Sequence, residues 1–337
     1  MSEIRLDRAA YLHNLTQICK KSGGVKNVIL VLKDNAYGHG AALAAEAASE
    51  FGIEFCAAKN EREAREIGYF FKHVLILSHI ANGDESDEFI YAANCLRDLE
   101  RMKEGAKIHL AVDTLMHRNG VLMSEIDAAL TLIKSRNLRL LGAYTHFRAS
   151  DELNADYFAQ RRNFSAAKDK ISKFCESEGL ARPIFHSHNS AGLERVERLD
   201  GEFSRVGMAQ YGYAQFDESL ALRPVMSLWA RRVSSRELKA GQGVGYGAKF
   251  VAPKDMRAAT YDVGYGDGLP RYAGEGELRT ACGLPLLGKM SMDSFSCEDA
   301  GEEICVFDDA RVWAKFFGTI EYDVLVKLSP FIKRVWR

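Results

Sequence analysis

The segment NVILVLKDNAYGHGAALAAEAASEF, residues 27–51, contains the features from which the fold of this chain can be predicted. Residues 27–32 are aliphatic on both faces, which is typical of a strand buried on both sides in a parallel sheet. Lys33 ends this strand, a polar, glycine-rich turn occupies residues 35–40, and the run 41–51 has a helix-forming composition. A strand, a turn and a helix in this order predict the first repeat of an α/β fold.

Short apolar strands alternate with amphipathic helical stretches from residue 27 to residue 208. The candidate strands are 27–33, 54–59, 73–79, 89–95, 107–113, 139–146, 183–188 and 203–208. Eight strands with intervening helices predict a (β/α)8 TIM barrel.

The helical periodicity of the sequence fades after about residue 222. Glycines cluster there, and short β-rich runs such as LLGKMSMD (286–293) and EEICVFDD (302–309) appear. We therefore expect a barrel domain over residues 1–221 and a mainly-β domain over residues 222–337, which the first few residues of the chain could also join.

Composition excludes several classes of protein. The chain has 337 residues, a net charge of −1 and 47% hydrophobic residues, which indicates neither a nucleic-acid-binding surface nor a membrane-binding one. No apolar run approaches the roughly 18 residues of a membrane span, and the charged start MSEIRLDRAAYLHNL is unlike a signal peptide. We expect a cytoplasmic protein whose seven scattered cysteines are buried, reduced thiols.

Polar side chains follow or end several of the predicted strands. Active sites of TIM barrels lie at the carboxyl ends of the strands, so these residues predict a common site, although any one of them alone could be a solvated loop residue. They are Lys33, Arg118, His146, Asn189, Ser190 and Arg205. A lysine ending a buried strand either extends to solvent or serves as a nucleophile or Schiff-base amine.

Four segments resemble motifs of the bacterial alanine racemases, pyridoxal-phosphate enzymes of fold type III. They are VLKDNAYGHG (31–40), FSRVGMAQYG (203–212), VGYGDGLPR (263–271) and GKMSMD (288–293). The resemblance covers essentially the whole chain. It implies a (β/α)8 barrel with a C-terminal mainly-β domain, pyridoxal 5'-phosphate as cofactor, and interconversion of L- and D-alanine, which supplies D-alanine for peptidoglycan. It also implies a homodimer in which Tyr265 and Met292 reach the partner's barrel.

A racemase must remove an α-proton from one face of the substrate and return a proton to the other, and two fixed bases do this directly. The resemblance assigns these roles to Lys33, freed from its imine with the cofactor, and to Tyr265. A tyrosine has an ordinary pKa of about 10 and needs a polarising neighbour to act as a base. By resemblance this neighbour is His146, which links the tyrosine to Arg205, and Arg205 in turn faces the pyridine nitrogen of the cofactor.

The resemblance also implies ligands for the rest of the cofactor and for the substrate. The expected cofactor contacts are Tyr37, Asn189, Ser190 and the backbone at Gly207 and Met208. The expected substrate contacts are Arg118, Met292 and Asp293.

The chain departs from the family pattern at three positions. Ala111 stands where many members carry a carbamate-modified lysine that orients the arginine equivalent to Arg118. Leu115 replaces a usual glycine and narrows its loop. Trp336 is aligned with a C-terminal tyrosine that binds phosphate, and because indole cannot accept a hydrogen bond, that contact is in doubt.

Other interpretations are open at this point. His186 and His188 share a face of their strand and could bind zinc in a metal-dependent hydrolase. A non-catalytic pyridoxal-phosphate carrier would use a similar lysine. A serine or broad-specificity racemase, or a two-domain decarboxylase of related fold, would share most of the motifs, although the VGYGDG and GKMSMD segments favour a racemase.

Overall fold

The computed structural model describes residues 1–216 and 220–337, which divide into two compact units. The barrel unit comprises residues 12–34 and 41–223. The β unit comprises residues 1–11, 35–40 and 224–337. Two short N-terminal segments therefore group with the C-terminal part of the chain, and one of them contains the polar turn 35–40.

The barrel unit is built on eight parallel strands. They are β2 (Val28–Val31), β3 (Phe55–Ala58), β4 (His73–Ile76), β5 (Ile90–Ala93), β6 (Lys107–Asp113), β8 (Arg139–Tyr144), β9 (Ile184–His188) and β10 (Phe203–Val206). The order β5-β4-β3-β2-β10-β9-β8-β6 is closed by pairing of β5 with β6, and the short β7 (Val121–Leu122) adds to β6. The predicted TIM barrel is confirmed, and all eight predicted strands are present.

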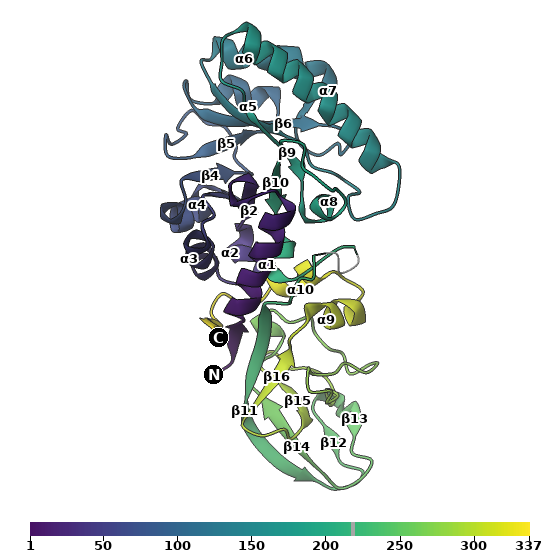
Figure 1. Cartoon of the computed structure of the whole chain (residues 1–337). Helices are drawn as coiled ribbons and strands as arrows, with labels where there is room; N and C mark the ends of the chain where they lie inside the picture. Colours follow the sequence, from purple (N-terminus) through teal and green to yellow (C-terminus); the bar gives the residue numbers. More distant parts are fainter. Residues whose placement is uncertain (217–219) are drawn as a thin grey trace. The chain divides into compact units, whose positions relative to one another are not determined.

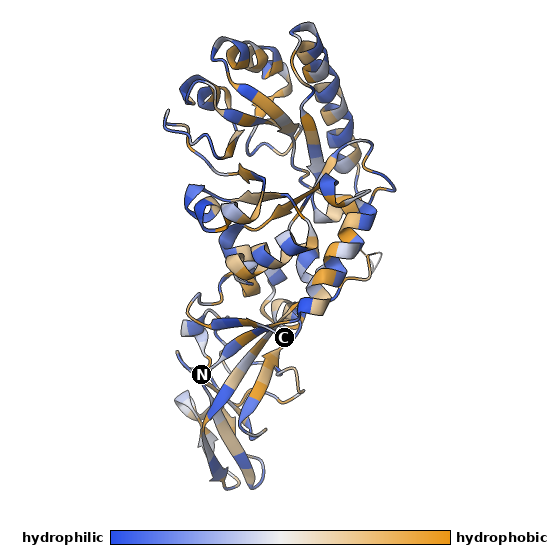
Figure 2. Cartoon of the chain, turned by 60° about the vertical axis from the view of Figure 1, so that its left-hand side comes forward, coloured by the Kyte–Doolittle hydropathy of each residue, from blue (hydrophilic) through white to orange (hydrophobic). Residues whose placement is uncertain are grey.

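The barrel strands are apolar because they face packed side chains on both sides. All four residues of β2 are buried, as are those of β3 and β5, and Figure 2 shows the strands largely in the hydrophobic colour. Several strands end one or two residues earlier than predicted. Leu32, beyond β2, still donates its N–H to the carbonyl of Ala57 at 2.9 Å, so the chain keeps strand-like contacts there although the regular ladder has stopped.

Helices follow the strands of the barrel unit and lie outside them (Figure 1). They are α1 (Arg8–Lys21), which begins in the β unit, α3 (Ala41–Phe51), α4 (Glu61–Ile67), α5 (Leu96–Arg101), α6 (Ile126–Ser135), α7 (Asp156–Ser177) and α8 (Ser190–Glu194). α3 spans the predicted residues. α4 begins where the Asn60 side chain accepts the N–H of Glu63 at 3.1 Å, a regular N-cap.

The β unit contains a six-stranded sheet centred on β11 (Met226–Leu238). Its other strands are β1 (Glu3–Leu6), β14 (Met256–Tyr261), β15 (Phe295–Glu298), β16 (Glu303–Phe307) and β17 (Lys333–Trp336). β1 pairs with β11 and with β17, which explains why the first residues belong to this unit. The hairpin β12 (Gly243–Val244) and β13 (Phe250–Val251) and the helices α9 (Ala310–Phe317) and α10 (Glu321–Val326) complete it.

Two expectations, one about the β unit and one about the cysteines of the whole chain, are partly wrong. The run 302–309 contains β16 as predicted, but 286–293 forms an irregular loop before β15, with Gly288 at a φ of 70° that breaks an extended conformation. All seven cysteines are free, but Cys95 and Cys282 are exposed rather than buried.

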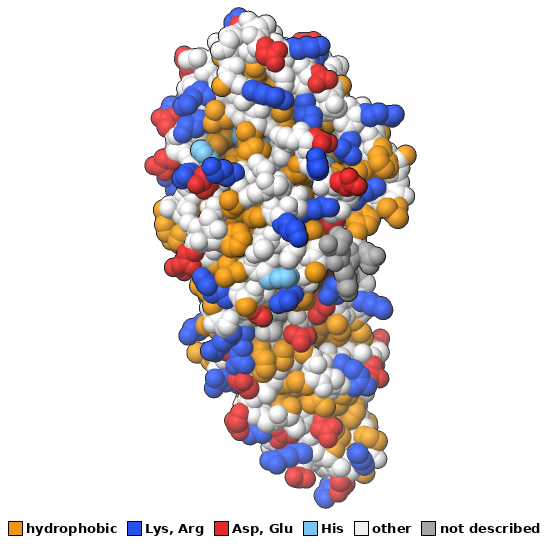
Figure 3. Space-filling view, viewed as in Figure 1, with side chains coloured by type: hydrophobic (Ala, Val, Ile, Leu, Met, Phe, Trp, Pro, Cys, Tyr) orange, Lys and Arg blue, Asp and Glu red, His pale blue; other side chains and the backbone are white. Residues whose placement is uncertain are grey.

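The surface carries charges of both signs. On the face shown in Figure 3, lysine and arginine side chains are interspersed with acidic ones, in keeping with the small net charge. No helix formed by residues 1–216 or 220–337 is both long and apolar enough to cross a bilayer.

Candidate active site

The segment after β2 is a single left-handed helical turn, α2 (Lys33–Tyr37) (Figure 1). Its residues Asp34 to Tyr37 have φ values of 52–54°, a conformation that costs non-glycine residues roughly 1–2 kcal/mol each. The barrel holds the start of this turn: Glu63 accepts the N–H of Asp34 at 2.9 Å, and Lys59 pairs with the Asp34 carboxylate at 2.7 Å. Lys33 is thereby fixed, half-buried, at the mouth of the barrel.

Arg205 on β10 is buried and donates hydrogen bonds to two histidines. Its Nη1 lies 2.8 Å from Nδ1 of His186, and its Nη2 lies 3.0 Å from Nδ1 of His146 and 3.0 Å from the carbonyl oxygen of Thr145. The sequence-based link between Arg205 and His146 is thus present in the geometry. His186 was missed in this role, because it was considered only as a metal ligand.

These contacts determine the tautomers of three histidines. Arginine can only donate, so the Nδ1 atoms of His146 and His186 accept, and a neutral ring then carries its proton on Nε2. Nε2 of His186 lies 2.8 Å from Nδ1 of His109 and donates to it. His109 therefore carries its own proton on Nε2, which is buried and has no hydrogen-bond partner within the described residues. A methyl group at Gly142 would lie 2.6 Å from this atom, so glycine is required beside it.

Burial keeps the histidines neutral. Desolvation, together with the smaller effect of the positive charges of Arg205, Arg118 and Lys33, lowers the pKa of His146 to about 3. Burial likewise lowers the pKa of His109 to about 3 and holds that of His186 well below its usual value. Lys33 follows β2, Arg118 follows β6 and Arg205 lies on β10, so three cations lie toward one end of the barrel, and such a group fits an anionic ligand.

Hydrogen-bond donors also meet at the carboxyl ends of β9 and β10. The hydroxyl of Ser190 lies 3.2 Å from the backbone nitrogens of both Gly207 and Ala209. Both N–H groups donate to the Ser190 oxygen, so the hydroxyl proton remains to donate to a ligand, and we call these three groups the anion-binding concavity. The side-chain oxygen of Asn189 caps α8 by accepting the N–H of Gly192 at 2.8 Å. Met208 is buried at the start of the short helix η4 (Met208–Tyr211).

In the β unit, the turn that carries Tyr265 is bonded to the loop that carries Met292. The backbone nitrogens of Tyr265 and Gly266 donate to the carbonyls of Ser291 and Met292 at 3.2 and 2.7 Å. A Cβ atom at Gly264 would lie 2.2 Å from the Met292 carbonyl oxygen, so only glycine permits this approach. The structure therefore brings Tyr265 together with Met292 and with the adjacent, exposed Asp293.

Tyr37 lies in the β unit, where its ring packs edge-on against Tyr322 of α10 at 5.8 Å. Trp336, by contrast, lies in β17 opposite Leu6 and packs against Tyr11 at 5.5 Å. The assignment of Trp336 as the replacement for the phosphate-binding tyrosine is corrected by this geometry, because Tyr322 is the C-terminal tyrosine beside Tyr37. Nothing in the sequence around Tyr322 marked this tyrosine as a candidate ligand.

The departures from the family pattern have visible consequences. Leu115 has a φ of 121°, a conformation that a glycine would adopt without strain. Arg118 is exposed in the loop after β6, and Ala111 offers no polar atom to orient it. The zinc interpretation loses its basis, because both ring nitrogens of His186 are used by Arg205 and His109, while Nδ1 of His188 faces the Gly192 carbonyl oxygen at 3.3 Å.

The predicted site residues thus fall into two sets. The barrel unit holds Lys33, Arg118, His146, Asn189, Ser190, Arg205, Gly207 and Met208, and the β unit holds Tyr37, Tyr265, Met292 and Asp293.

Comparison with known proteins identifies the family. Residues 6–215 match the family model "Alanine racemase, N-terminal domain", and residues 225–336 match "Alanine racemase, C-terminal domain". Alanine racemases of Campylobacter curvus and Campylobacter jejuni subsp. doylei are 66% and 50% identical, each aligned over 99% of both chains. The structure resembles alanine racemase of Clostridium difficile 630 (TM-score 0.90, 24% identity, 100% of this chain and 95% of that one) and of Streptomyces lavendulae (TM-score 0.83, 25% identity, 100% and 97%). With both domain models matched in order along the chain, this protein belongs to the alanine racemase family.

Proposed function

We propose that this chain interconverts L-alanine and D-alanine with pyridoxal 5'-phosphate as its cofactor. The observation that carries the proposal is the placement of Lys33 after β2, Arg118 after β6 and Arg205 on β10 of a closed barrel, with Arg205 bonded to His146 at 3.0 Å. Membership of the alanine racemase family supports it over a carrier or a decarboxylase.

The donors of the barrel unit fit the proposed cofactor. The Ser190 hydroxyl would donate to its phosphate, because the Ser190 oxygen already accepts the N–H groups of Gly207 and Ala209 at 3.2 Å and its proton is left to donate. The amine of Lys33 would hold the aldehyde carbon, and Arg205 would face the ring nitrogen with donors only. When bound, the cofactor supplies an electron sink that makes the α-proton of an amino acid acidic.

Lys33 and Tyr265 are the proposed bases on the two faces of the substrate. Lys33 exchanges the α-proton of the D-enantiomer, and Tyr265 exchanges that of the L-enantiomer. His146 accepts a hydrogen bond from Arg205 on Nδ1 and so presents an N–H on Nε2. A donor of this kind would stabilise the phenolate of Tyr265 and lower the barrier to its proton transfers.

The substrate carboxylate is proposed to bind Arg118 and the backbone at Met292 and Asp293. Arg118 provides a positive charge in the loop after β6, and Met292 lies in the loop bonded to the Tyr265 turn. This pair of contacts recognises any small amino acid, so a serine or broad-specificity racemase is the alternative. Assaying alanine, serine and larger amino acids in parallel separates these substrates.

The absorption spectrum of the purified protein tests the cofactor assignment. We expect a band of lysine-bound pyridoxal phosphate that borohydride removes, and racemisation of alanine by the untreated protein. Lys33→Ala should lack the band, whereas Lys173→Ala, an exposed lysine on α7, should keep it. A wild-type protein without the band would refute the proposal.

The active sites are proposed to be shared in a homodimer, with Tyr265 and Met292 serving the partner's barrel. Lys33 and Tyr265 belong to different compact units, so each could act with a residue of another chain. Mixing Lys33→Ala and Tyr265→Phe subunits should restore activity, because each heterodimer would contain one complete site. Absence of restored activity in confirmed heterodimers would contradict sharing.

A further inference from the structure

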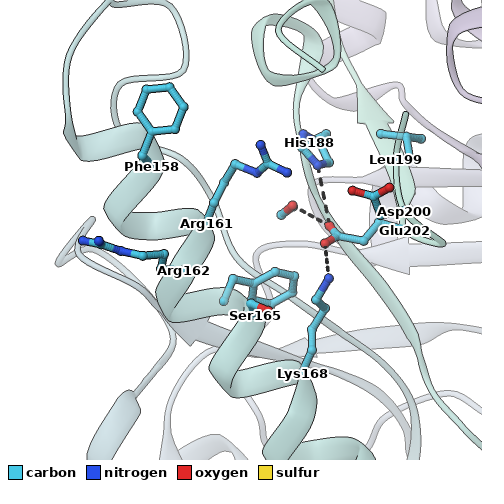
Figure 4. Close-up of a pocket in the computed structure, with 11 residues that line it drawn as sticks. Phe158, Arg161, Arg162, Ser165, Lys168, His188, Leu199, Asp200 and Glu202 are labelled. Atoms are coloured by element: carbon cyan, nitrogen blue, oxygen red, sulfur yellow. Dashed lines mark hydrogen bonds and ion pairs between the residues drawn. The ribbon is translucent and has the colours of Figure 1, made fainter. Parts of the chain in front are cut away.

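A cavity of about 520 Å³ lies in the barrel unit (Figure 4). One side is formed by α7, and the other by the end of β9 and by residues 199–202, which follow β9 and precede β10. It is separate from the residues assigned above to catalysis and cofactor binding. Its wall combines apolar side chains (Phe158, Phe164, Leu199) with polar and charged ones (Arg161, Arg162, Ser165, Lys168, Ser187, His188, Asp200, Glu202).

The buried carboxylate of this cavity, Glu202, already has partners on both of its oxygens. Glu202 accepts a hydrogen bond from the Ser187 hydroxyl at 2.5 Å and pairs with the ammonium of Lys168 at 2.6 Å. These two contacts use both carboxylate oxygens. Glu202 therefore offers little attraction to a cationic ligand, although it lies at the cavity floor.

His188 presents an unused acceptor to the cavity. Its residue is 2% exposed, and its Nδ1 faces the carbonyl oxygen of Gly192 at 3.3 Å, so a neutral ring carries the proton on Nδ1. Nε2 then bears a lone pair. The nearest polar atom recorded for it is Oε2 of Glu202 at 3.9 Å, which is too far for a hydrogen bond and is itself an acceptor.

Positive charge faces this lone pair across the cavity. Arg161 extends from α7 toward His188, whereas Arg162 points away from it (Figure 4). Neither arginine has a carboxylate partner in the portions of the chain that the structure describes. Asp200, the other carboxylate of the wall, is exposed, so solvent screens its charge. Guanidinium groups bind oxyanions through directed pairs of hydrogen bonds, so the Arg161 side of the cavity favours an anion.

We propose that this cavity binds a phosphate group, held by Arg161 and by a hydrogen bond to Nε2 of His188. A carboxylate or a sulfate has no proton at neutral pH and would turn an oxygen lone pair toward that of His188. A phosphate group can bring a proton to this contact while its other oxygens accept from Arg161. The site and its ligand are independent of the proposed racemase reaction.

The apolar wall distinguishes two sources of the phosphate group. Phe158, Phe164 and Leu199 could contact the carbon atoms of a phosphate monoester but add nothing for inorganic phosphate. At about pH 6, where roughly half of a phosphate monoester still carries a proton, glycerol 3-phosphate should therefore bind more tightly than inorganic phosphate. Equal affinities would indicate the free ion as the ligand.

Calorimetric titration of the holoenzyme tests the proposal, because the cofactor's own phosphate then occupies its subsite. We expect saturable binding of inorganic phosphate, a roughly 10- to 100-fold loss of affinity in Arg161→Gln, as one charge-assisted hydrogen bond contributes, and weaker binding of sulfate than of phosphate. Arg97→Gln, an exposed arginine on α5, is the matched control and should bind like wild type.

Three outcomes would overturn the proposal. They are an absence of saturable phosphate binding, unchanged affinity in Arg161→Gln, and sulfate binding as tight as that of phosphate. The last result would mean that charge alone attracts the ion and that Nε2 of His188 accepts no hydrogen bond from a phosphate proton.

Discussion

Replacing His109 by Gln should make the stability of this protein less sensitive to acid. Burial lowers the pKa of His109 to about 3, from an ordinary value of 6.5. Below pH 6.5 the unfolded chain therefore binds a proton that the folded protein does not. The free energy of unfolding contributed by neutral His109 is fully present above that pH and is lost as the pH falls from 6.5 toward 3.

The size of the effect follows from the two pKa values. A group with these values lowers the free energy of unfolding by about 1.2 kcal/mol between about pH 6 and pH 5, where the unfolded histidine becomes almost fully protonated. His109→Gln should remove this amount from the acid loss seen in the wild type. Glutamine keeps an acceptor for the Nε2–H of His186, so the hydrogen-bond chain to Arg205 can persist.

Urea-induced unfolding at about pH 8, 6 and 5 provides the measurement, with the pH 8 values as the reference state in which histidine is neutral in both forms. His39, in the β unit, also has a pKa lowered to about 3 by burial. The double variant of His39 and His109 should flatten the pH dependence about twice as much, provided both units unfold in one transition. If His109→Gln and wild type lose the same free energy between pH 6 and pH 5, the reasoning is wrong.

Three further predictions concern backbone geometry and the anion-binding concavity. Gly264→Ala should reduce racemisation at least tenfold, because its Cβ would lie 2.2 Å from the Met292 carbonyl oxygen and the Tyr265 turn must move; retained wild-type kinetics would contradict this. Ser190→Ala should weaken cofactor affinity, measured by fluorescence titration, and destabilise the apoprotein by roughly 1–3 kcal/mol, since two buried N–H groups lose their acceptor. Leu115→Gly should raise the urea concentration at the midpoint of unfolding. Relief of the backbone strain at a φ of 121° stabilises the fold by roughly 1–3 kcal/mol, which exceeds the roughly 0.5–1 kcal/mol entropic cost of glycine. A lower midpoint would show that the packing of the Leu115 side chain contributes more than this strain costs.

The barrel could be predicted because its determinants are local and repeated. Each strand is a short apolar run, each helix has its own periodicity, and α3 matched the expected residues 41–51. Lys33, His146 and Arg205 were recognisable because each lies at or near a strand end, where the topology of a TIM barrel gathers side chains. The motif around Tyr265 and the one around Met292 were read separately, and their hydrogen bonds to one another became visible only in the structure.

Several features of the site depended on contacts between residues distant in sequence. Four consecutive residues adopt a left-handed turn after Lys33 although none is glycine, and intrinsic preferences argue against it. Tyr322 became a candidate only because α10 carries it to Tyr37. In the sequence His109 is an ordinary strand residue; only the structure shows that its ring extends the series of hydrogen bonds that runs from Arg205 through His186.

By itself, then, the sequence determined the strands of the barrel, the helices between them and the chemical types available at the barrel mouth, because propensity and periodicity act over a few residues. Only the tertiary structure decided which histidine nitrogens carry protons, which tyrosine accompanies Tyr37, and that residues 35–40 group with the β unit. These outcomes are set by burial, by ring packing between Tyr37 and Tyr322, and by hydrogen bonds between residues on different strands, such as those of His186 with Arg205 and with His109, and no local pattern encodes them.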